Sequence, residues 1–240
     1  MDLFAGGLVV LAASFLGGVT GFGYSLVATP LLLILGFDLP FVVTANLALA
    51  CVTRIPVAVR FRSDARPGRA TGLIAGSVPG LWLGAVVLTT VDDSTIKLCA
   101  GLVVMVAAVL LWRAVTAPPP RELPGAPIAA GFAGGFLGAA TSLNGVAPVL
   151  LLARDKAAPR SVLADLALYF VASNAIGLAV LGVQGALDAD AVPAFLLWLP
   201  GSLAGNWAGT VVGPRLPETG FRRLTLAIVF LAGAVTALTA

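Results

Sequence analysis

The chain has 240 residues, of which 59% are hydrophobic and 10% are charged, and its formal net charge is +3. A soluble domain of this length needs a larger charged surface, and the alternating ten-residue pattern of an outer-membrane β-barrel is absent from the sequence. The composition therefore predicts an all-α polytopic membrane protein.

The first apolar stretch, residues 3–35, is too long for one membrane span. At about 1.5 Å per residue it would extend about 50 Å, against a hydrocarbon core of about 30 Å. It is also interrupted by the glycine-rich residues 17–23. We therefore expect a broken or re-entrant pair of half-helices here. Three stretches that suit single spans follow, at residues 40–59, 70–91 and 95–112.

A proline-rich linker is predicted at residues 117–126, because prolines punctuate the longest polar stretch. It divides the chain into an N-terminal membrane repeat, 1–116, and a C-terminal membrane repeat, 127–240. The second repeat also opens with a long stretch, 127–153, which is interrupted at residues 134–145. Three further stretches suit single spans, at residues 161–183, 189–213 and 221–239.

One pattern occurs in both halves. Glycines four residues apart leave a smooth strip on a helix, so that a second helix can approach closely. We expect this pattern to serve packing, with the helices around Gly80 and Gly205 packing against each other. The pattern is Gly76, Ser77, Gly80, Trp82 and Gly84 in the first half, and Gly201, Ser202, Gly205, Trp207 and Gly209 in the second.

The loop charges predict how the chain crosses the membrane, because basic loops favour the cytoplasm. If all eight stretches cross, the basic loops divide almost evenly between the two sides. If stretches 3–35 and 127–153 are re-entrant, every loop lysine and arginine except Lys97 lies on the cytoplasmic side, and both termini lie outside. Three spans per half is an odd number, so the two repeats are then inverted, as in many transporters.

The two interruptions predict a site for a small anion. The N-termini of half-helices present free N–H groups and a partial positive charge, which attract anions. The alternative is that the glycines only allow close packing and the hydroxyls bond to nearby carbonyls. The expected substrate-binding residues are Thr20, Gly21, Gly23, Tyr24 and Ser25 in the first break, and Thr141, Ser142 and Asn144 in the second.

Four polar side chains inside apolar stretches have open roles. Arg54 can offset the charge of an anionic substrate, or extend toward the headgroups at the cytoplasmic surface. Asp165 is a candidate coupling carboxylate, a partner for an arginine, or an interfacial residue at a helix start. Asn174 and Asn206 either line a pathway or form hydrogen bonds between helices.

Several kinds of chemistry are not expected. The chain has no histidine, which removes the commonest proton shuttle and metal ligand. Cys51 and Cys99 lie in apolar stretches without metal-ligand spacing, so we expect no disulfide, metal or cofactor. No nucleophile, base and orienting group occur together, so an enzyme is not expected. The basic residues are scattered over short loops, and nucleic acid is not an expected partner.

The sequence resembles the TauE/SafE sulfite exporter family in several features. These are the glycine-rich residues 17–25 with their continuation to Leu32, the weaker echo at residues 134–150, the basic loop after the second stretch, and the two-fold repeat. The resemblance implies a bacterial inner-membrane permease that exports sulfite, sulfonates or related small organic anions. Two departures point to a different substrate: Gly-Phe-Gly-Tyr at residues 21–24 replaces a longer glycine run, and the second break is poorer in glycine.

Together these features predict a secondary transporter, an exporter of a small anion such as sulfite or an organosulfonate, working by alternating access in the lipid bilayer of the bacterial inner membrane. The coupling ion, proton or sodium, stays open, and so does a homo-oligomer. Two other functions also stay open: an anion channel, and a non-transporting membrane partner subunit.

Overall fold

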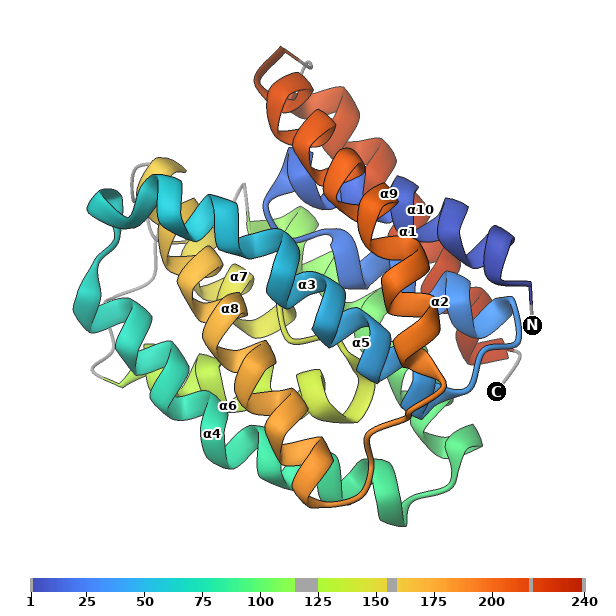
Figure 1. Ribbon diagram of the computed structural model, residues 1–240. Coiled ribbons are helices and arrows are strands. Elements are labelled where there is room, and N and C mark those ends of the chain that lie inside the picture. Colours follow the sequence, from blue (N-terminus) through green and yellow to red (C-terminus); the bar gives the residue numbers. More distant parts are fainter. Residues whose placement is uncertain (1, 115–124, 155–158, 216–217, 239–240) are drawn as a thin grey trace.

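Figure 1 shows the computed structural model, which describes residues 2–114, 125–154, 159–215 and 218–238 and is helical throughout its regular structure. Five of its helices are long and apolar enough to cross a membrane, namely α1, α3, α4, α5 and α8, and this confirms the expected class. The helices are α1 (Leu3–Thr20), α2 (Tyr24–Ile34), α3 (Leu39–Phe61), η1 (Arg62–Asp64), α4 (Pro67–Thr90), α5 (Asp93–Ala114), α6 (Ala126–Thr141), α7 (Val146–Arg154), α8 (Pro159–Val183), α9 (Ala191–Val212), η2 (Gly213–Arg215) and α10 (Glu218–Leu238).

The structure describes only the last two residues of the predicted linker, Gly125 and Ala126. Its residues 117–124 lie outside the described residues. Gly125 forms a turn, and Ala126 already belongs to α6.

The first glycine-rich interruption is a helical hairpin. Gly21 ends α1 with φ +84°, a left-handed conformation that glycine adopts without steric cost. The chain then folds back, so that α2 begins against α1. The close approach is seen at Gly17, where an added Cβ atom would lie 2.9 Å from the Tyr24 Cβ. At the other end of the hairpin, a Cβ on Gly6 would lie 3.1 Å from the ring of Phe37, which follows α2. The chain therefore leaves this hairpin close to where it entered.

The second interruption is also a hairpin. Ser142 ends α6 with φ +60°, which is an unusual conformation for a residue with a Cβ. A Cβ atom on Gly134 of α6 would lie 2.7 Å from the Asn144 carbonyl oxygen and 2.9 Å from Pro148 of α7. The predicted interruption of both long stretches is therefore confirmed, and α7 packs back on α6 as α2 packs on α1.

The repeated glycine pattern packs helices from opposite halves together. A Cβ on Gly80 of α4 would lie 2.1 Å from the carbonyl oxygen of Phe132 in α6. A Cβ on Gly209 of α9 would lie 2.1 Å from the carbonyl oxygen of Phe15 in α1. The predicted packing role is correct, but the predicted partner is wrong. Instead of facing each other, α4 packs on α6 and α9 packs on α1, and Figure 1 shows both pairs side by side.

Helices α3 and α8 cross in opposite directions. Cys51 lies near the Val171 carbonyl oxygen, with 3.6 Å between sulfur and oxygen, and Leu47 lies against Gly177 further along α8. Residue numbers thus rise along one helix as they fall along the other. Helix α3 therefore begins at the end of the molecule where α8 finishes, which the hydrogen bond from the Asp188 N–H to Thr44 also shows.

These directions place opposite charges at the two ends of the molecule. We call the end where α3 begins the acidic end, and the end where α3 finishes the basic end. Helix α1 begins at the acidic end, whereas α6 begins at the basic end beside the start of α4. The basic end carries Arg60, Arg62, Arg66, Arg69 and Arg160, and the acidic end carries Asp38, Asp92, Asp188 and Asp190.

The outward faces of the helices are apolar. The tryptophans of the repeated pattern point outward, with Trp82 49% and Trp207 69% exposed, as do Phe4 and Leu196. Contiguous apolar surface of this kind is what a lipid bilayer covers. Buried polar side chains gather inside, around the two hairpins.

Candidate anion site at the helix breaks

The two hairpin tips meet in the interior. A Cβ atom built on Gly145, in the second break, would lie 3.1 Å from the ring of Phe170 and 3.8 Å from the carbonyl oxygen of Phe22, in the first break. Arg54 extends from α3 over the same Phe170 ring, with 5.8 Å between the guanidinium carbon and the ring centroid. Residues from both halves of the chain therefore surround Arg54.

Arg54 is a buried cation. It is 5% exposed, and its Nη2 donates a hydrogen bond to the Gly17 carbonyl oxygen at 3.1 Å. The carbonyls near the end of α1 and the face of the Phe170 ring both favour a positive charge. No carboxylate lies within ion-pair distance of Arg54 in the described part of the chain. Its guanidinium points inward to α1, and among the described residues its charge faces the Gly17 carbonyl and the Phe170 ring.

The start of α2 lies beside this guanidinium. A Cβ on Gly17 would lie 3.2 Å from both the Arg54 Nη2 and the Tyr24 N. No side chain caps α2 at Gly23, so the N–H groups of its first turn have no partner within the helix. A guanidinium and a helix N-terminus thus both lie next to Gly17, and both favour an anion.

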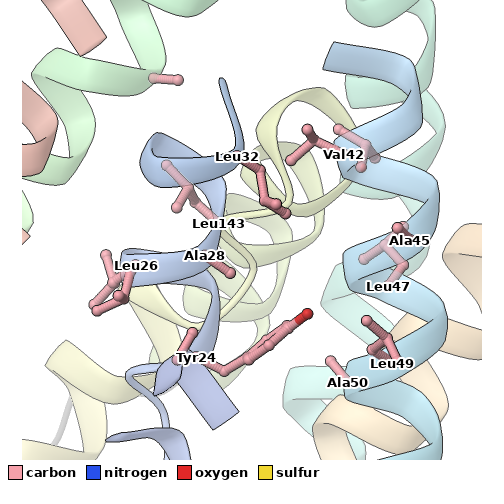
Figure 2. Close-up of a cluster of buried hydrophobic side chains, with 14 of the residues drawn as sticks. Tyr24, Leu26, Ala28, Leu32, Val42, Ala45, Leu47, Leu49, Ala50 and Leu143 are labelled. Carbon is pink, nitrogen blue, oxygen red and sulfur yellow. The ribbon is translucent and has the colours of Figure 1, made fainter. Parts of the chain in front are cut away.

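A second set of polar side chains joins the breaks to α3. The Tyr24 hydroxyl donates to the Asn46 Oδ1 at 2.8 Å, and the Asn46 Nδ2 donates to Thr29 at 3.2 Å and to Ser142 at 3.1 Å. Thr29 and Ser142 share a further hydrogen bond. Figure 2 shows the Tyr24 ring reaching from α2 toward α3, with Leu143 of the second break beside α2. The network fixes the second break against the first half.

Two members of this network, Thr29 and Asn46, are not among the binding residues predicted from the sequence. Thr29 and Asn46 are both 1% exposed, and each uses its side chain to hold Ser142. Each is a polar residue within an apolar stretch of the sequence. This pattern could have indicated a buried hydrogen bond, since burying a polar group requires a hydrogen-bond partner. Which partner it finds is decided by the packing of distant segments.

The threonines that end the two first half-helices bond within their own breaks. The Thr20 hydroxyl donates to the Leu16 carbonyl at 2.8 Å and accepts from the Gly23 N–H at 2.9 Å. The Thr141 hydroxyl donates to the Leu137 carbonyl at 2.7 Å. Such local bonds satisfy these hydroxyl groups. Gly21 supplies the left-handed turn described above, and Ser25 is buried in the first turn of α2.

Asn144 faces away from this network, toward α8. Its Nδ2 donates to the Asn174 Oδ1, and its backbone carbonyl accepts from the Tyr169 hydroxyl at 3.2 Å. Asn206 of α9 donates to the Thr53 carbonyl of α3 at 3.4 Å. Both asparagines that had open roles therefore make hydrogen bonds between segments. The ligand role of the predicted break residues stays a prediction.

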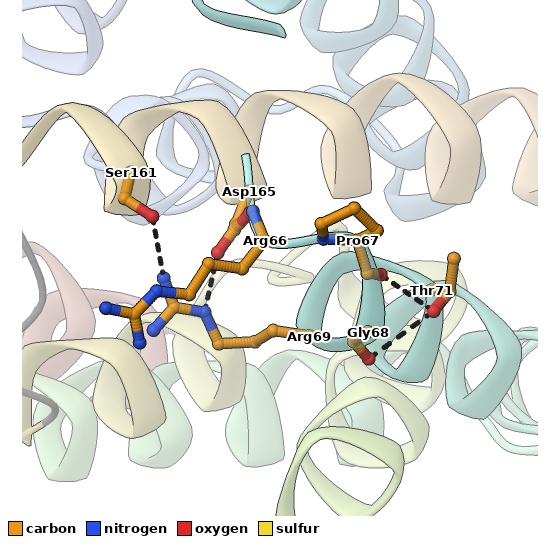
Figure 3. Close-up of polar contacts among 7 residues, drawn as sticks. All are labelled: Arg66, Pro67, Gly68, Arg69, Thr71, Ser161 and Asp165. Atoms are coloured by element: carbon orange, nitrogen blue, oxygen red, sulfur yellow. Dashed lines mark hydrogen bonds and ion pairs between the residues drawn. The ribbon is translucent and has the colours of Figure 1, made fainter. Parts of the chain in front are cut away.

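Asp165 lies at the basic end, in a buried ion pair. Its Oδ2 lies 2.5 Å from the Arg69 Nε, and its Oδ1 accepts from the Arg66 backbone N–H at 2.8 Å. The Arg69 Nη2 also donates to Ser161 at 3.3 Å. Figure 3 shows these side chains bridging the start of α4 and the first turns of α8. Asp165 is thus the partner of an arginine in this structure, and its coupling role stays a prediction.

Ser142→Gly is expected to be more stable than Ser142→Ala by about 1 kcal/mol. Both changes remove the hydroxyl that Thr29 and Asn46 bond, but only alanine must keep a Cβ at φ +60°, which costs an L-residue about 1–2 kcal/mol. Chemical unfolding of the two purified variants measures the difference. Equal stability would show that the backbone at this position relaxes.

Asp165→Asn is expected to destabilise the protein by about 3 kcal/mol, because it removes the carboxylate from a buried ion pair with Arg69. The double variant Asp165→Leu with Arg69→Met should recover most of this loss, since it removes both charges together. Thermal unfolding in detergent measures both effects. A double variant no more stable than the single one would contradict the pairing.

The sequence matches one family model, described as sulfite exporter TauE/SafE, over residues 6–236. No curated protein and no solved structure matches the chain. The match covers almost the whole chain, and it confirms the resemblance found from the glycine-rich breaks.

Proposed function

Because the chain belongs to the TauE/SafE sulfite exporter family of membrane transporters, we propose that it exports a small anion, such as sulfite or an organosulfonate, by alternating access. One observation carries the proposal. Arg54 is a buried guanidinium beside the uncapped start of α2, at the place where both hairpin tips meet. An anion there would gain charge-assisted hydrogen bonds from both.

The arrangement of the helices supports alternating access. Half one begins at the acidic end and half two at the basic end, as expected for inverted repeats around a central site. The Arg69–Asp165 pair ties α4 to α8 at the basic end. We propose that the halves rock about the crossing of α3 and α8, and that this pair must separate when the site opens toward the basic end.

Flux measurements test this function. Protein reconstituted in liposomes should take up labelled sulfite with saturation, and unlabelled sulfite inside should accelerate the uptake by counterflow. Counterflow requires a site that alternates between the two sides. Flux that rises linearly with concentration and shows no counterflow would favour an anion channel instead. No flux of sulfite or methanesulfonate would favour a partner subunit.

We further propose that the basic end faces the cytoplasm of a bacterial inner membrane, since basic loops favour that side. Helix α10 runs antiparallel to α5, with Gly233 against Gly101, so it finishes at the acidic end, where α5 begins. A reporter fused after Ala240 is then expected outside the cytoplasm. Alkaline phosphatase fused there should be active, whereas a fluorescent protein that folds only in the cytoplasm should be dark. A fluorescent fusion would contradict the orientation.

A further inference from the structure

Asn174 lies next to the position in half two that corresponds to Arg54 in half one. Aligning Pro40 with Pro159, at the starts of α3 and α8, sets Arg54 opposite Ser173, one residue from Asn174. Each side chain also contacts the hairpin of its own half. Arg54 donates to Gly17, and Asn174 accepts from Asn144. The repeat therefore places Asn174 beside the counterpart of Arg54, and each of the two side chains contacts the hairpin of its own half.

The amide of Asn174 has an unused donor. The residue is fully buried, its Oδ1 is bonded to Asn144, and its Nδ2 has no hydrogen-bond partner within the described ranges. The other asparagines of the core donate from their Nδ2 atoms, Asn46 to Thr29 and Ser142, and Asn206 to Thr53. A buried donor without a partner is costly, so such a group calls for an explanation.

Asn174 lies close to the candidate anion site. It follows Phe170 by four residues, about 6 Å along the same face of α8, and the Phe170 ring lies under the Arg54 guanidinium. The second break is in contact with both residues, through Gly145 at Phe170 and Asn144 at Asn174. The second break therefore lies against the part of α8 that carries both Phe170 and Asn174.

We propose that the Asn174 Nδ2 donates to the bound anion, and that the site is completed by Arg54 on one side and Asn174 on the other. This inference rests on the proposed function and extends it to the class of ligand. Separate donors on two helices suit an oxyanion, in which one oxygen faces the guanidinium and another faces the amide. A sulfonate or sulfite group has several oxygens that can accept from separate donors. A halide is a single atom and cannot offer one acceptor to each donor.

Thermal stabilisation by methanesulfonate tests the inference, since a ligand that binds the folded state raises the unfolding temperature. Asn174→Asp keeps an acceptor for Asn144 but replaces the donor with a negative group, and binding should be lost. Asn174→Leu provides a second variant in case a buried carboxylate prevents folding. Its affinity should fall about 10-fold to 100-fold, as expected for losing a hydrogen bond to a charged group.

Asn206→Leu is the matched control. It removes another buried asparagine of similar size whose Nδ2 is already bonded to Thr53, so it should lower stability and leave the affinity for methanesulfonate unchanged. Wild-type affinity in Asn174→Leu would overturn the inference. Chloride stabilising as strongly as methanesulfonate would overturn the oxyanion class.

The Arg54→Met variant distinguishes this inference from the proposed function. If Arg54→Met loses binding while Asn174→Leu retains it, the anion site stands and only the role of Asn174 is wrong. If methanesulfonate, sulfite and chloride all fail to stabilise the wild-type protein, the proposed anion site itself is contradicted, and the inference falls with it.

Discussion

Gly80→Ala is expected to destabilise the protein by about 3 kcal/mol or more, because the added methyl group overlaps backbone. The new Cβ would lie 2.1 Å from the Phe132 carbonyl oxygen and 2.8 Å from the Phe136 N, both in α6. A flexible side chain could move aside, but a helix backbone must shift as a unit. The interface between α4 and α6 would therefore have to open along its length.

Size-exclusion profiles of the detergent-solubilised variant, followed by thermal unfolding, measure this loss. Gly68→Ala is the control, because it makes the same change in the same helix where no atom lies within 4 Å of the new Cβ. That change should be neutral or slightly stabilising, since alanine favours a helix over glycine by up to about 1 kcal/mol. Equal behaviour of the two variants would contradict the close packing of α4 on α6.

Arg54→Met is expected to abolish anion transport while the protein stays folded. Methionine has a similar length and no charge, so the change removes a buried cation that has no carboxylate partner among the described residues. Removing a buried charge that has no ion-pair partner is about neutral for stability. Losing the counter-charge of a bound anion should cost about 2–5 kcal/mol of binding, which is at least about 30-fold in affinity.

Flux in liposomes and unfolding in detergent measure the two effects separately. Arg54→Lys is the control, because it keeps the charge but lacks the planar set of donors. It should retain weak, salt-sensitive binding. Loss of stability in Arg54→Met, with transport unchanged for the folded fraction, would show that Arg54 serves packing of α3 on α1.

The sequence by itself determined the class of the fold and the positions of the breaks. Apolar stretches of span length cannot leave their backbone polar groups unpaired in a bilayer, so they form helices. The breaks follow from local conformation. Gly21 adopts φ +84°, and the predicted interruption at residues 17–23 ends α1 at Thr20 and starts α2 at Tyr24.

Only the tertiary structure decided which segments meet, because contacts between distant segments depend on the direction and register of whole helices. The glycine pattern predicted close packing correctly, but its partners, α6 for Gly80 and α1 for Gly209, lie in the opposite halves. The sequence left three roles possible for Asp165, and its ion pair with Arg69 became evident only from the packing of α8 on the start of α4. The unused donor of Asn174 is likewise invisible in the sequence, since a hydrogen bond that is missing can be recognised only after all neighbours are in position.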